Sequence, residues 1–227
     1  MKERSCSNKD RFQKRLPHIL AHVKGDANKS FEHGQEVKRS KVRLRQSQRS
    51  KACKLTPPIR SAQSASIINH LKTHPLWKSS TMVFAYVPMK DEPDIFPLLE
   101  EILAIGKQLV LPRFDASTGT YHPVRIRNIA TDLQPGKYGI LEPADCHLNA
   151  EGLHPDLTLV PGLAFDSQGW RLGRGKGYYD RMLAGPGGIR FGIAFDFQYL
   201  ETVPHETLDQ KMDWIITPDG PAKAALM

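Results

Sequence analysis

A ten-residue segment, Arg171-Leu-Gly-Arg-Gly-Lys-Gly-Tyr-Tyr-Asp180, combines alternate glycines, cationic side chains, paired tyrosines and a carboxylate. Its glycines allow the backbone to adopt positive φ and to approach a ligand closely, so that successive N–H groups can point at an anion. Between them, Arg174 offers a planar fork of donors and Lys176 a compact point charge. This mixture predicts a site for a polyphosphate that loses its terminal phosphoryl group.

The acid that ends this glycine segment, Asp180, could hold a hard divalent cation through oxygen. The glycine spacing matches neither the dinucleotide fingerprint nor the P-loop, and glycine-rich charged segments are commonly surface turns, so an ordinary loop is the alternative. The context favours a phosphate site, because the segment follows the apolar run Leu157-Thr-Leu-Val-Pro161 and precedes Tyr178 to Leu183, which can begin a helix. A strand, a glycine loop and a helix in this order aim backbone N–H groups at phosphate.

The elements that must position the segment alternate between strand and helix. Met82 to Tyr86 predicts a buried strand, Ile95 to Ile105 a helix closed by Gly106, and Gln108 to Leu111 the next strand. Further strands are predicted at residues 157–160, 189–195 and 214–217, an antiparallel edge strand at 121–126, and a loop at 136–143. The alternation predicts a three-layer α/β domain with a largely parallel sheet.

Two helices are predicted ahead of this alternation. Val37 to Lys54 lacks Gly and Pro and is rich in Lys, Arg, Gln and Ser, and Thr56-Pro57-Pro58 should end it. Lys41 and Arg45 are one turn apart and face the same way, either toward a ligand or simply toward water. The second helix has an apolar stripe, formed by Ile67, Ile68 and Leu71, that should pack against the sheet.

The net charge of +8 is distributed unevenly along the 227 residues. Residues 1–60 hold 17 basic and 5 acidic side chains, whereas the remainder holds 15 basic and 19 acidic ones. The core domain therefore lacks the charge expected of a nucleic-acid-binding enzyme. Residues 1–36 are predicted to form a basic extension that is disordered or only weakly helical. An RNA-associated role for this arm is an alternative, and such binding would weaken steeply with salt.

Targeting and compartment follow from the same region. Acidic residues within the arm argue against a mitochondrial transit peptide, and no apolar core of a secretory signal is present, so a cytoplasmic location is expected. No apolar run approaches the ~20 residues needed to cross a bilayer. Cys6, Cys53 and Cys146 lie far apart without metal-ligand spacing, which indicates a reducing compartment. One domain over residues 37–220 and a tail over 221–227 are expected.

In a parallel α/β sheet, ligands bind beyond the carboxyl ends of the strands, so loops that follow strands are the places to seek chemistry. Asp91 and Glu92 follow the first strand and could accept hydrogen bonds from a polar ring, or could simply be acids at a helix start. The run His205-Glu-Thr-Leu-Asp-Gln-Lys-Met-Asp213 follows a later strand. Asp213 could meet Asp180 across a metal ion, or could lie in a solvated loop.

The run Val160-Pro-Gly-Leu-Ala-Phe-Asp-Ser-Gln-Gly169, together with the glycine segment extended to Arg181, closely resembles the signature of the 5-formyltetrahydrofolate cyclo-ligase (methenyltetrahydrofolate synthetase) family. Five further segments agree in order: Lys41-x-x-Leu-Arg45, Tyr86-Val-Pro with Asp91-Glu92, Gly106-Lys-Gln-Leu-Val-Leu-Pro-Arg113, Tyr138-Gly-Ile-Leu-Glu-Pro143 and Asp213-Trp-Ile-Ile-Thr217. The resemblance covers about residues 38–218.

The resemblance implies an ATP- and Mg²⁺-dependent ligase that converts 5-formyltetrahydrofolate into 5,10-methenyltetrahydrofolate, with release of ADP and phosphate. The family is thought to phosphorylate the formyl oxygen and to form an iminium phosphate. A three-layer Rossmann-like (NagB/RpiA/CoA-transferase-like) domain acting on these small molecules as a monomer is therefore expected. A sugar-phosphate isomerase or transferase on the same scaffold, which should not need ATP, is the alternative, because a fold does not fix a function.

The resemblance also assigns roles to individual residues. The implied ATP site comprises Lys41, Arg45, Arg171, Leu172, Gly173, Arg174, Gly175, Lys176, Gly177, Tyr178 and Tyr179. The implied folate site comprises Arg45, Val87, Glu92, Tyr138, Arg174, Lys176 and Tyr178, with Glu92 bonding the pterin ring. Arg174 and Lys176 would be the catalytic residues that stabilise the migrating phosphoryl group, and Asp180 and Asp213 would hold magnesium.

Overall fold

A computed structural model describes residues 16–136, 139–144, 153–185 and 188–225. The chain divides into two compact units, Met1–Ser40 and Lys41–Met227, and helix α2 (Leu16–Lys54) belongs to both. The helix ends where the sequence predicted but begins well before Val37. Between Pro17 and Pro57 the sequence has no proline that would stop a helix, although two glycines weaken it. The part of the expected extension that is described is thus helical.

The second unit is built on a seven-stranded sheet, in the order β12-β11-β9-β6-β1-β2-β3 among the described residues. The strands are β1 (Met82–Phe84), β2 (Gln108–Asp115), β3 (Thr120–Ile126), β6 (Leu157–Pro161), β9 (Ile189–Ile193), β11 (Trp214–Thr217) and β12 (Gly220–Lys223). The five central strands, β2, β1, β6, β9 and β11 in spatial order, pair in parallel. The edge strands β3 and β12 pair antiparallel with β2 and β11. The predicted mainly parallel sheet and the predicted edge strand after β2 are confirmed.

Strand order reverses beside β1, because the chain passes from β1 to β2 on one side and later returns to β6 on the other. A crevice forms outside the carboxyl ends of parallel strands at such a reversal. Residues 85–95, which follow β1, and the loops that follow β6 are therefore placed at a common edge although they are far apart in the sequence.

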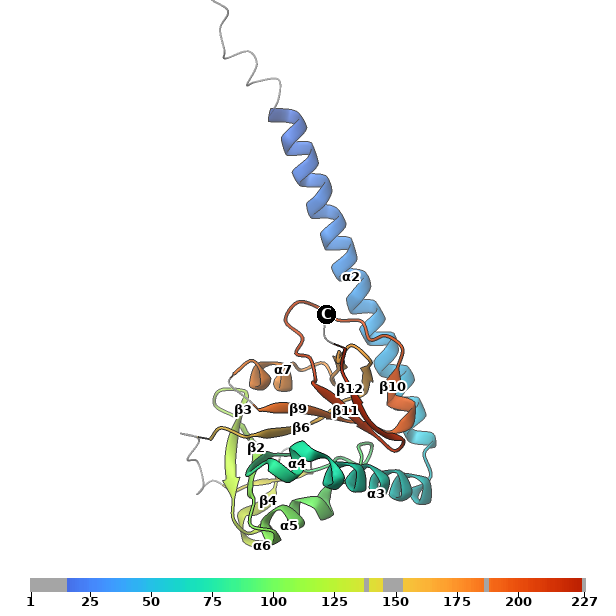
Figure 1. Ribbon diagram of the computed structural model, residues 1–227. Helices are drawn as coiled ribbons and strands as arrows, with labels where there is room; N and C mark the ends of the chain where they lie inside the picture. The colour runs from blue at the N-terminus through green and yellow to red at the C-terminus, as the bar shows by residue number, and fades with distance from the viewer. Residues whose placement is uncertain (1–15, 137–138, 145–152, 186–187, 226–227) are drawn as a thin grey trace, which may run out of the picture. The chain divides into compact units, whose positions relative to one another are not determined.

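Helices cover both faces of the sheet (Figure 1). On one face lie α3 (Pro57–Thr73), α4 (Pro75–Ser79) and α5 (Phe96–Ala104), and on the other lies α7 (Tyr178–Leu183). Helix α5 begins where the Asp94 carboxylate accepts a hydrogen bond from the Phe96 N–H at 3.1 Å, and it stops before Gly106, which has φ of 79°. The three-layer arrangement is the one predicted.

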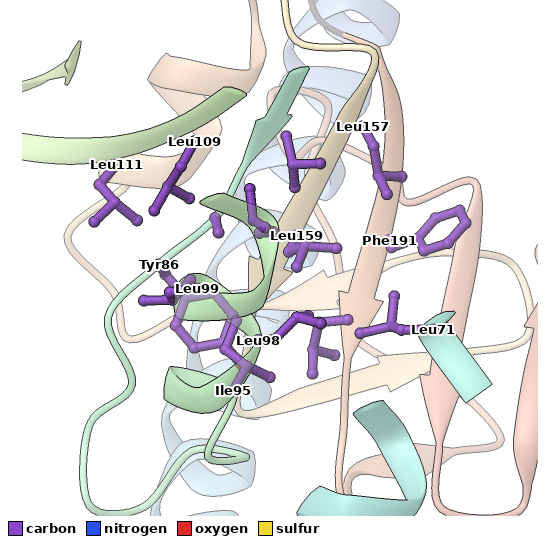
Figure 2. Close-up of a cluster of buried hydrophobic side chains, with 14 of the residues drawn as sticks. Leu71, Tyr86, Ile95, Leu98, Leu99, Leu109, Leu111, Leu157, Leu159 and Phe191 are labelled. Atoms are coloured by element: carbon purple, nitrogen blue, oxygen red, sulfur yellow. The ribbon is translucent and has the colours of Figure 1, made fainter. Parts of the chain in front are cut away.

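The larger core lies between the sheet and α3, α4 and α5 (Figure 2). Alternate strand residues such as Leu157 and Leu159 point into it, whereas Val160 packs on the opposite face with Leu183 of α7. Strands buried on both faces explain the nearly continuous apolar runs in the sequence. A rigid, doubly covered sheet therefore carries the loops at its carboxyl edge.

Several short elements were not predicted. Residues 133–143, for which a loop was expected at 136–143, contain a hairpin of β4 (Leu133–Pro135) and β5 (Leu141–Pro143), preceded by α6 (Ile129–Asp132). A second small sheet joins β7 (Ala164–Asp166), β8 (Arg171–Leu172) and β10 (Tyr199–Leu200), the last following the 3₁₀ turn η2 (Asp196–Gln198). The expected tail from residue 221 instead supplies most of β12, since a turn at Gly220 folds the chain back onto β11.

No helix in the described part of the chain is long and apolar enough to cross a membrane.

Candidate active site

A cavity of about 300 Å³ opens at the carboxyl edge of the sheet, at the strand-order reversal. Val87 lines it just after β1, Pro112 lines it from β2, and Gly162 lines it just after β6. Much of the remaining wall comes from the glycine segment, of which residues 171, 173, 174 and 176–180 face the cavity. The segment proposed for chemistry and the loop after β1 therefore share one cavity.

The glycine segment begins with β8 of the small sheet and does not follow β6 directly. Gly175 has φ of 100° and Gly177, at the start of α7, has φ of 65°, a region that side chains with a Cβ disfavour. Leu172 was assigned to the ATP site, but its side chain is buried with Leu163, Ala164 and other apolar groups, because β8 pairs with β7 and turns it inward. Among the described residues, Leu172 is thus a core residue.

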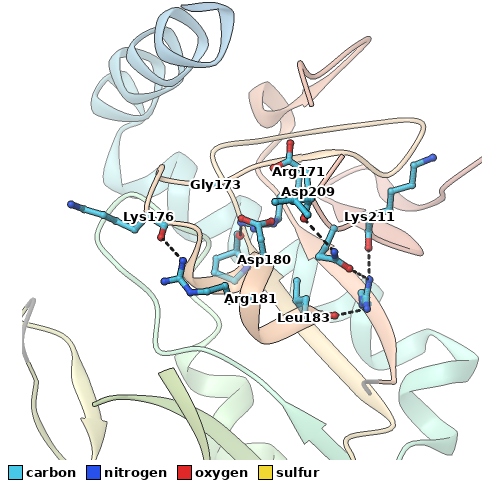
Figure 3. A network of polar contacts seen from close by, with 12 residues as sticks. Arg171, Gly173, Lys176, Asp180, Arg181, Leu183, Asp209 and Lys211 are labelled. Atoms are coloured by element: carbon cyan, nitrogen blue, oxygen red, sulfur yellow. Dashed lines mark hydrogen bonds and ion pairs between the residues drawn. The ribbon is translucent and has the colours of Figure 1, made fainter. Parts of the chain in front are cut away.

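Arg171 lies at the base of the segment and is almost fully buried, with 3% of its side chain exposed. Its Nη2 donates to the Asp180 carboxylate at 2.8 Å (Figure 3). Its guanidinium lies 5.6 Å from the centre of the Tyr179 ring. Because a buried cation needs a partner, this ion pair fixes the carboxylate that the sequence assigned to magnesium. Asp180 is held at the cavity wall, which it lines.

Helix α2 reaches the glycine segment through Arg45. The Arg45 Nε donates to the Gly173 carbonyl oxygen at 2.9 Å, and the guanidinium carbon would lie only 3.4 Å from a Cβ placed on Gly175. Burial, with a smaller contribution from the nearby Arg49 charge, lowers the pKa of Arg45. The structure therefore brings together the two parts of the chain that were predicted to hold polyphosphate.

Lys41 lies one turn earlier on α2 and is also buried. Its Nζ donates to Glu206 at 2.8 Å and to Asp209 at 2.5 Å, both in the loop between β10 and β11. Lys41 does not line the cavity itself. It lies instead at an acidic margin of the site, next to the turn that carries Arg45.

Asp213, which was expected to hold magnesium together with Asp180, does not line the cavity. Its carboxylate accepts a hydrogen bond from the Arg190 N–H at 2.7 Å, at the start of β9, and Asp213 directly precedes β11. The starts of parallel strands lie at the edge of the sheet opposite to their ends, so Asp213 is remote from the cavity edge.

Asp209, which the sequence reasoning did not single out, lies in the same loop but near Arg45. Asp180, Glu206 and Asp209 are all close enough to Arg45 for their charges to favour its protonated form. The loop from β10 to β11 leaves the carboxyl edge and returns to the amino edge. Its early acids are therefore the ones near the site, a signal that could have favoured Asp209 over Asp213.

The loop after β1 contributes two acids that meet Arg174. Arg174 donates from Nη2 to Asp91 at 2.6 Å, and from Nε and Nη2 to Glu92 at 3.2 and 3.0 Å. Glu92 is buried and also accepts from the Met89 N–H at 3.0 Å. Burial raises the pKa of Glu92 in spite of Arg174. Burial also acts against ionisation of Asp91, but the hydrogen bond and charge of Arg174 outweigh it and lower the pKa of Asp91.

The cavity also has an aromatic wall. The ring of Tyr178 packs edge-on against Tyr121 at 5.1 Å and Phe114 at 5.8 Å between ring centroids, and Tyr121 lines the cavity as well. Val87 faces the same space. Tyr138, assigned to this wall, lies outside the described residues.

Two cations at the cavity have no side-chain partner in the described part of the chain. One is Lys176, which is exposed and lines the cavity as expected. The other is Arg49, which the sequence analysis missed. Arg49 is four residues after Arg45 and eight after Lys41, so continuing the helical stripe by one turn could have identified it.

The described residues contain no group of three or more His, Cys, Asp or Glu side chains able to hold a metal ion. Mg²⁺ usually binds through one or two carboxylates together with substrate phosphates and water. Asp180 and Asp209 meet that requirement, since both lie near Arg45 at the predicted phosphate site. The donor chemistry fits a magnesium–nucleotide complex and not a metal held by protein alone.

Comparison with known proteins shows which family the chain belongs to. The sequence model of the 5-formyltetrahydrofolate cyclo-ligase family matches residues 37–218. The chain belongs to this family. The cyclo-ligase of Mycolicibacterium smegmatis is 36% identical over 152 residues, covering 62% of this chain and 75% of that protein. The mouse cyclo-ligase is 29% identical over 182 residues, covering 74% and 88%.

Solved structures agree with this family. The NMR structure of 5,10-methenyltetrahydrofolate synthetase from Aquifex aeolicus superposes with a TM-score of 0.72 at 34% identity, covering 82% of this chain and 94% of that one. The family relationship supports neither a sugar-phosphate isomerase nor a transferase. A role of the basic arm with RNA has not been tested.

Proposed function

We propose that this protein converts 5-formyltetrahydrofolate into 5,10-methenyltetrahydrofolate with consumption of ATP and release of ADP and phosphate. The observation that carries the proposal is the meeting, in one cavity, of the cationic glycine segment with the acidic loop after β1. Arg174 of the first and Glu92 of the second are within 3.0 Å of each other. An anion site and a site for ring donors are thus adjacent, as a transfer from ATP to a pterin substituent requires.

ATP is proposed to bind on the side of α2 and the glycine segment. Lys176 and Arg49 present cationic groups there, Arg45 lies behind the segment on Gly173, and the backbone near Gly175 can approach an oxygen closely because no Cβ intervenes. A polyphosphate would give Lys176 and Arg49 the partners that the described residues do not supply.

The folate is proposed to bind against the loop after β1. Pterin N–H donors suit the Glu92 carboxylate, and the aromatic wall of Tyr121 and Tyr178 suits the flat rings of the substrate. This pose places the formyl group, attached to the pterin, between Glu92 and the cationic segment.

The chemistry is then a positioned phosphoryl transfer. The formyl oxygen attacks the γ-phosphorus, the bond to ADP breaks, and the N5-formyl group becomes an iminium phosphate. N10 attacks the same carbon, phosphate leaves with the C–O electron pair, and the N10 proton is lost. Arg174 and Lys176 offset the negative charge that spreads over the phosphoryl oxygens during both steps.

Magnesium, when bound, would neutralise charge on the β- and γ-phosphate oxygens. Asp180 and Asp209 are the carboxylates proposed to hold it. Asp180 is already fixed by Arg171, so it can offer its remaining oxygen without reorganisation.

The test is the absorbance rise of methenyltetrahydrofolate after purified protein is mixed with 5-formyltetrahydrofolate and Mg²⁺, with and without ATP. A rise only with ATP, with one ADP formed per product, is the expected result. Folded protein that binds ATP but gives no rise would show that the nucleotide is used on another acceptor, and would overturn the proposal.

A further inference from the structure

The acceptor capacity of Glu92 is nearly filled in this structure. A carboxylate has about four lone-pair positions for hydrogen bonds. Three are taken: two by Arg174 and one by the Met89 N–H. A pterin that presents two N–H donors side by side needs two positions, so one bond from Arg174 must be released before such a ring can be fully bound.

Arg174 has a second anchor that does not share this conflict. Its Nη2 donates to Asp91 at 2.6 Å, shorter than either of its bonds to Glu92. Asp91 is much more exposed than Glu92, with 30% against 7% of the side chain accessible. Ionisation of Asp91 is favoured in the folded protein while burial works against ionisation of Glu92. Asp91 is therefore the better permanent partner for the cation.

The guanidinium also has unused donors. No hydrogen bond from Arg174 Nη1 is found within the described residues, and Nη1 carries two N–H groups. Arg174 is flanked by Gly173 and Gly175, and the left-handed φ of Gly175 shows that the backbone there uses glycine's freedom. The side chain can therefore turn toward an anion over the glycine segment while one N–H group stays on Asp91.

We propose that Asp91 is a positioning residue that retains Arg174 while the guanidinium exchanges Glu92 for the phosphate of the nucleotide. This inference rests on the proposed function, since it assumes a pterin at Glu92 and a polyphosphate at the glycine segment. A consequence is that nucleotide and folate favour each other's binding, because the phosphate draws Arg174 off the acceptor that the pterin needs. By linkage the effect is reciprocal.

The test is a double-mutant cycle on binding. The dissociation constant of 5-formyltetrahydrofolate is measured with and without the non-hydrolysable β,γ-imido analogue of ATP, for wild type, Asp91→Asn, Arg174→Met and the double variant. Wild type should bind the folate about five- to tenfold more tightly with the analogue, the lower range of known couplings. Arg174→Met should show less than a twofold effect of the analogue.

Among the described residues, Asp91→Asn leaves Glu92 as the only carboxylate that Arg174 contacts, so folate binding without nucleotide should weaken about tenfold. The same substitution in the Arg174→Met background should change it less than twofold, because Asp91 acts only through Arg174. Asp91→Glu should restore most of the binding. Lys90→Gln, an exposed change in the same loop, is the control and should behave as wild type.

An equal cost of Asp91→Asn in both backgrounds would overturn the inference, as would wild-type folate binding without any effect of the analogue. Either result, together with ATP-dependent product formation by wild type, would leave the proposed function standing. Failure of wild type to bind either ligand would overturn the proposed function and this inference with it. Thermal unfolding of each variant is the check that the protein is folded at the temperature of the titrations.

Discussion

The Nε of Arg45 donates a hydrogen bond to the carbonyl oxygen of Gly173 at 2.9 Å, across 128 positions of sequence. The bond ties α2 to the glycine segment, so a helix that precedes the sheet in the chain becomes part of the site. The bond also fixes how α2 is rotated about its axis. Gln48 and Ala52, on later turns of the helix, are buried against the protein, whereas Arg49 remains exposed and lines the cavity.

Arg49→Ala is predicted to lower kcat/KM for ATP about tenfold, because it removes a charged hydrogen bond to the nucleotide at a partly solvated site. Its guanidinium lines the cavity, and it is close enough to Arg45 to affect the pKa of that residue. Steady-state kinetics at fixed folate check this. Arg43→Ala removes the same charge from an exposed position elsewhere on α2 and should be neutral. Equal effects of the two substitutions would exclude a direct contact.

Lys176→Ala is predicted to lower kcat at least about a hundredfold without loss of stability. The side chain is exposed, lines the cavity and makes no hydrogen bond to the described residues, so the fold does not depend on it. Stabilisation of a transferring phosphoryl group, in contrast, would depend on its charge. Single-turnover rates and thermal unfolding measure the two effects. Lys78→Ala on α4 serves as the control. Turnover close to wild type in Lys176→Ala would remove Lys176 from the chemistry.

The elements that local patterns specify were predictable. The run from Met82 to Leu111 gave the β1-α5-β2 unit because apolar runs, a helix stripe and Gly106 are all local signals. The glycine segment could be placed at the carboxyl edge of the sheet because it comes after the apolar run of β6 and before the helix α7, which are also local signals. Most of its residues line one cavity together with Val87 and Glu92.

What failed depends on the path of the chain through space. Local patterns do not separate Asp209, which lies near Arg45, from Asp213, which bonds to the start of β9, because both acids lie in one loop and only the route of that loop from the carboxyl to the amino edge distinguishes them. Leu172 turned inward because β7 and β8 form a hairpin of their own. The bond between Arg174 and Glu92 joins positions 82 apart, and no local pattern contains it.

Asp180→Ala is predicted to abolish most turnover and also to lower the free energy of unfolding by about 2–3 kcal/mol. Loss of the carboxylate leaves the buried guanidinium of Arg171 without its ion-pair partner. Asp180→Asn keeps an acceptor for Arg171 and should recover most of the stability but little of the activity, because a neutral amide binds magnesium poorly. Urea unfolding and the absorbance assay separate the two losses. Equal stability of Asp180→Ala and wild type would contradict the structural role of the pair.

The pH profile should report Glu92. Because burial raises the pKa of this carboxyl above its ordinary value of 4.5, it becomes protonated at a higher pH than an exposed glutamate as the solution is acidified. Pterin donors need the ionised form, so kcat/KM for the folate should fall on the acid side with an apparent pKa above 4.5. Asp91, whose pKa is lowered, should not contribute in that range. In Glu92→Gln the acid limb should disappear from a much lower profile. Persistence of the same limb would assign it to another group.

The linked effect on stability has the opposite sign. A raised pKa in the folded protein means that Glu92 contributes stability below its ordinary pKa and that this contribution is lost as pH rises through the raised value. Glu92→Gln should therefore gain stability relative to wild type as pH increases from 4.5 toward neutrality. Thermal unfolding across that range provides the check, and a relative loss of stability over the same interval would mean that the Arg174 charge more than offsets the effect of burial on Glu92.

Truncation tests how much of α2 belongs to the enzyme. Deletion of residues 1–36 removes a segment that lies outside the second unit, which begins at Lys41, and the remaining helix is still anchored by the burial of Lys41, Gln48 and Ala52. We expect kcat within about twofold of wild type, since surface changes away from such contacts are nearly neutral. Deletion through Arg45 removes the partner of Glu206 and Asp209 as well as the bond to Gly173, and should abolish turnover. A large loss from the shorter deletion would show that the basic arm is part of the catalytic unit.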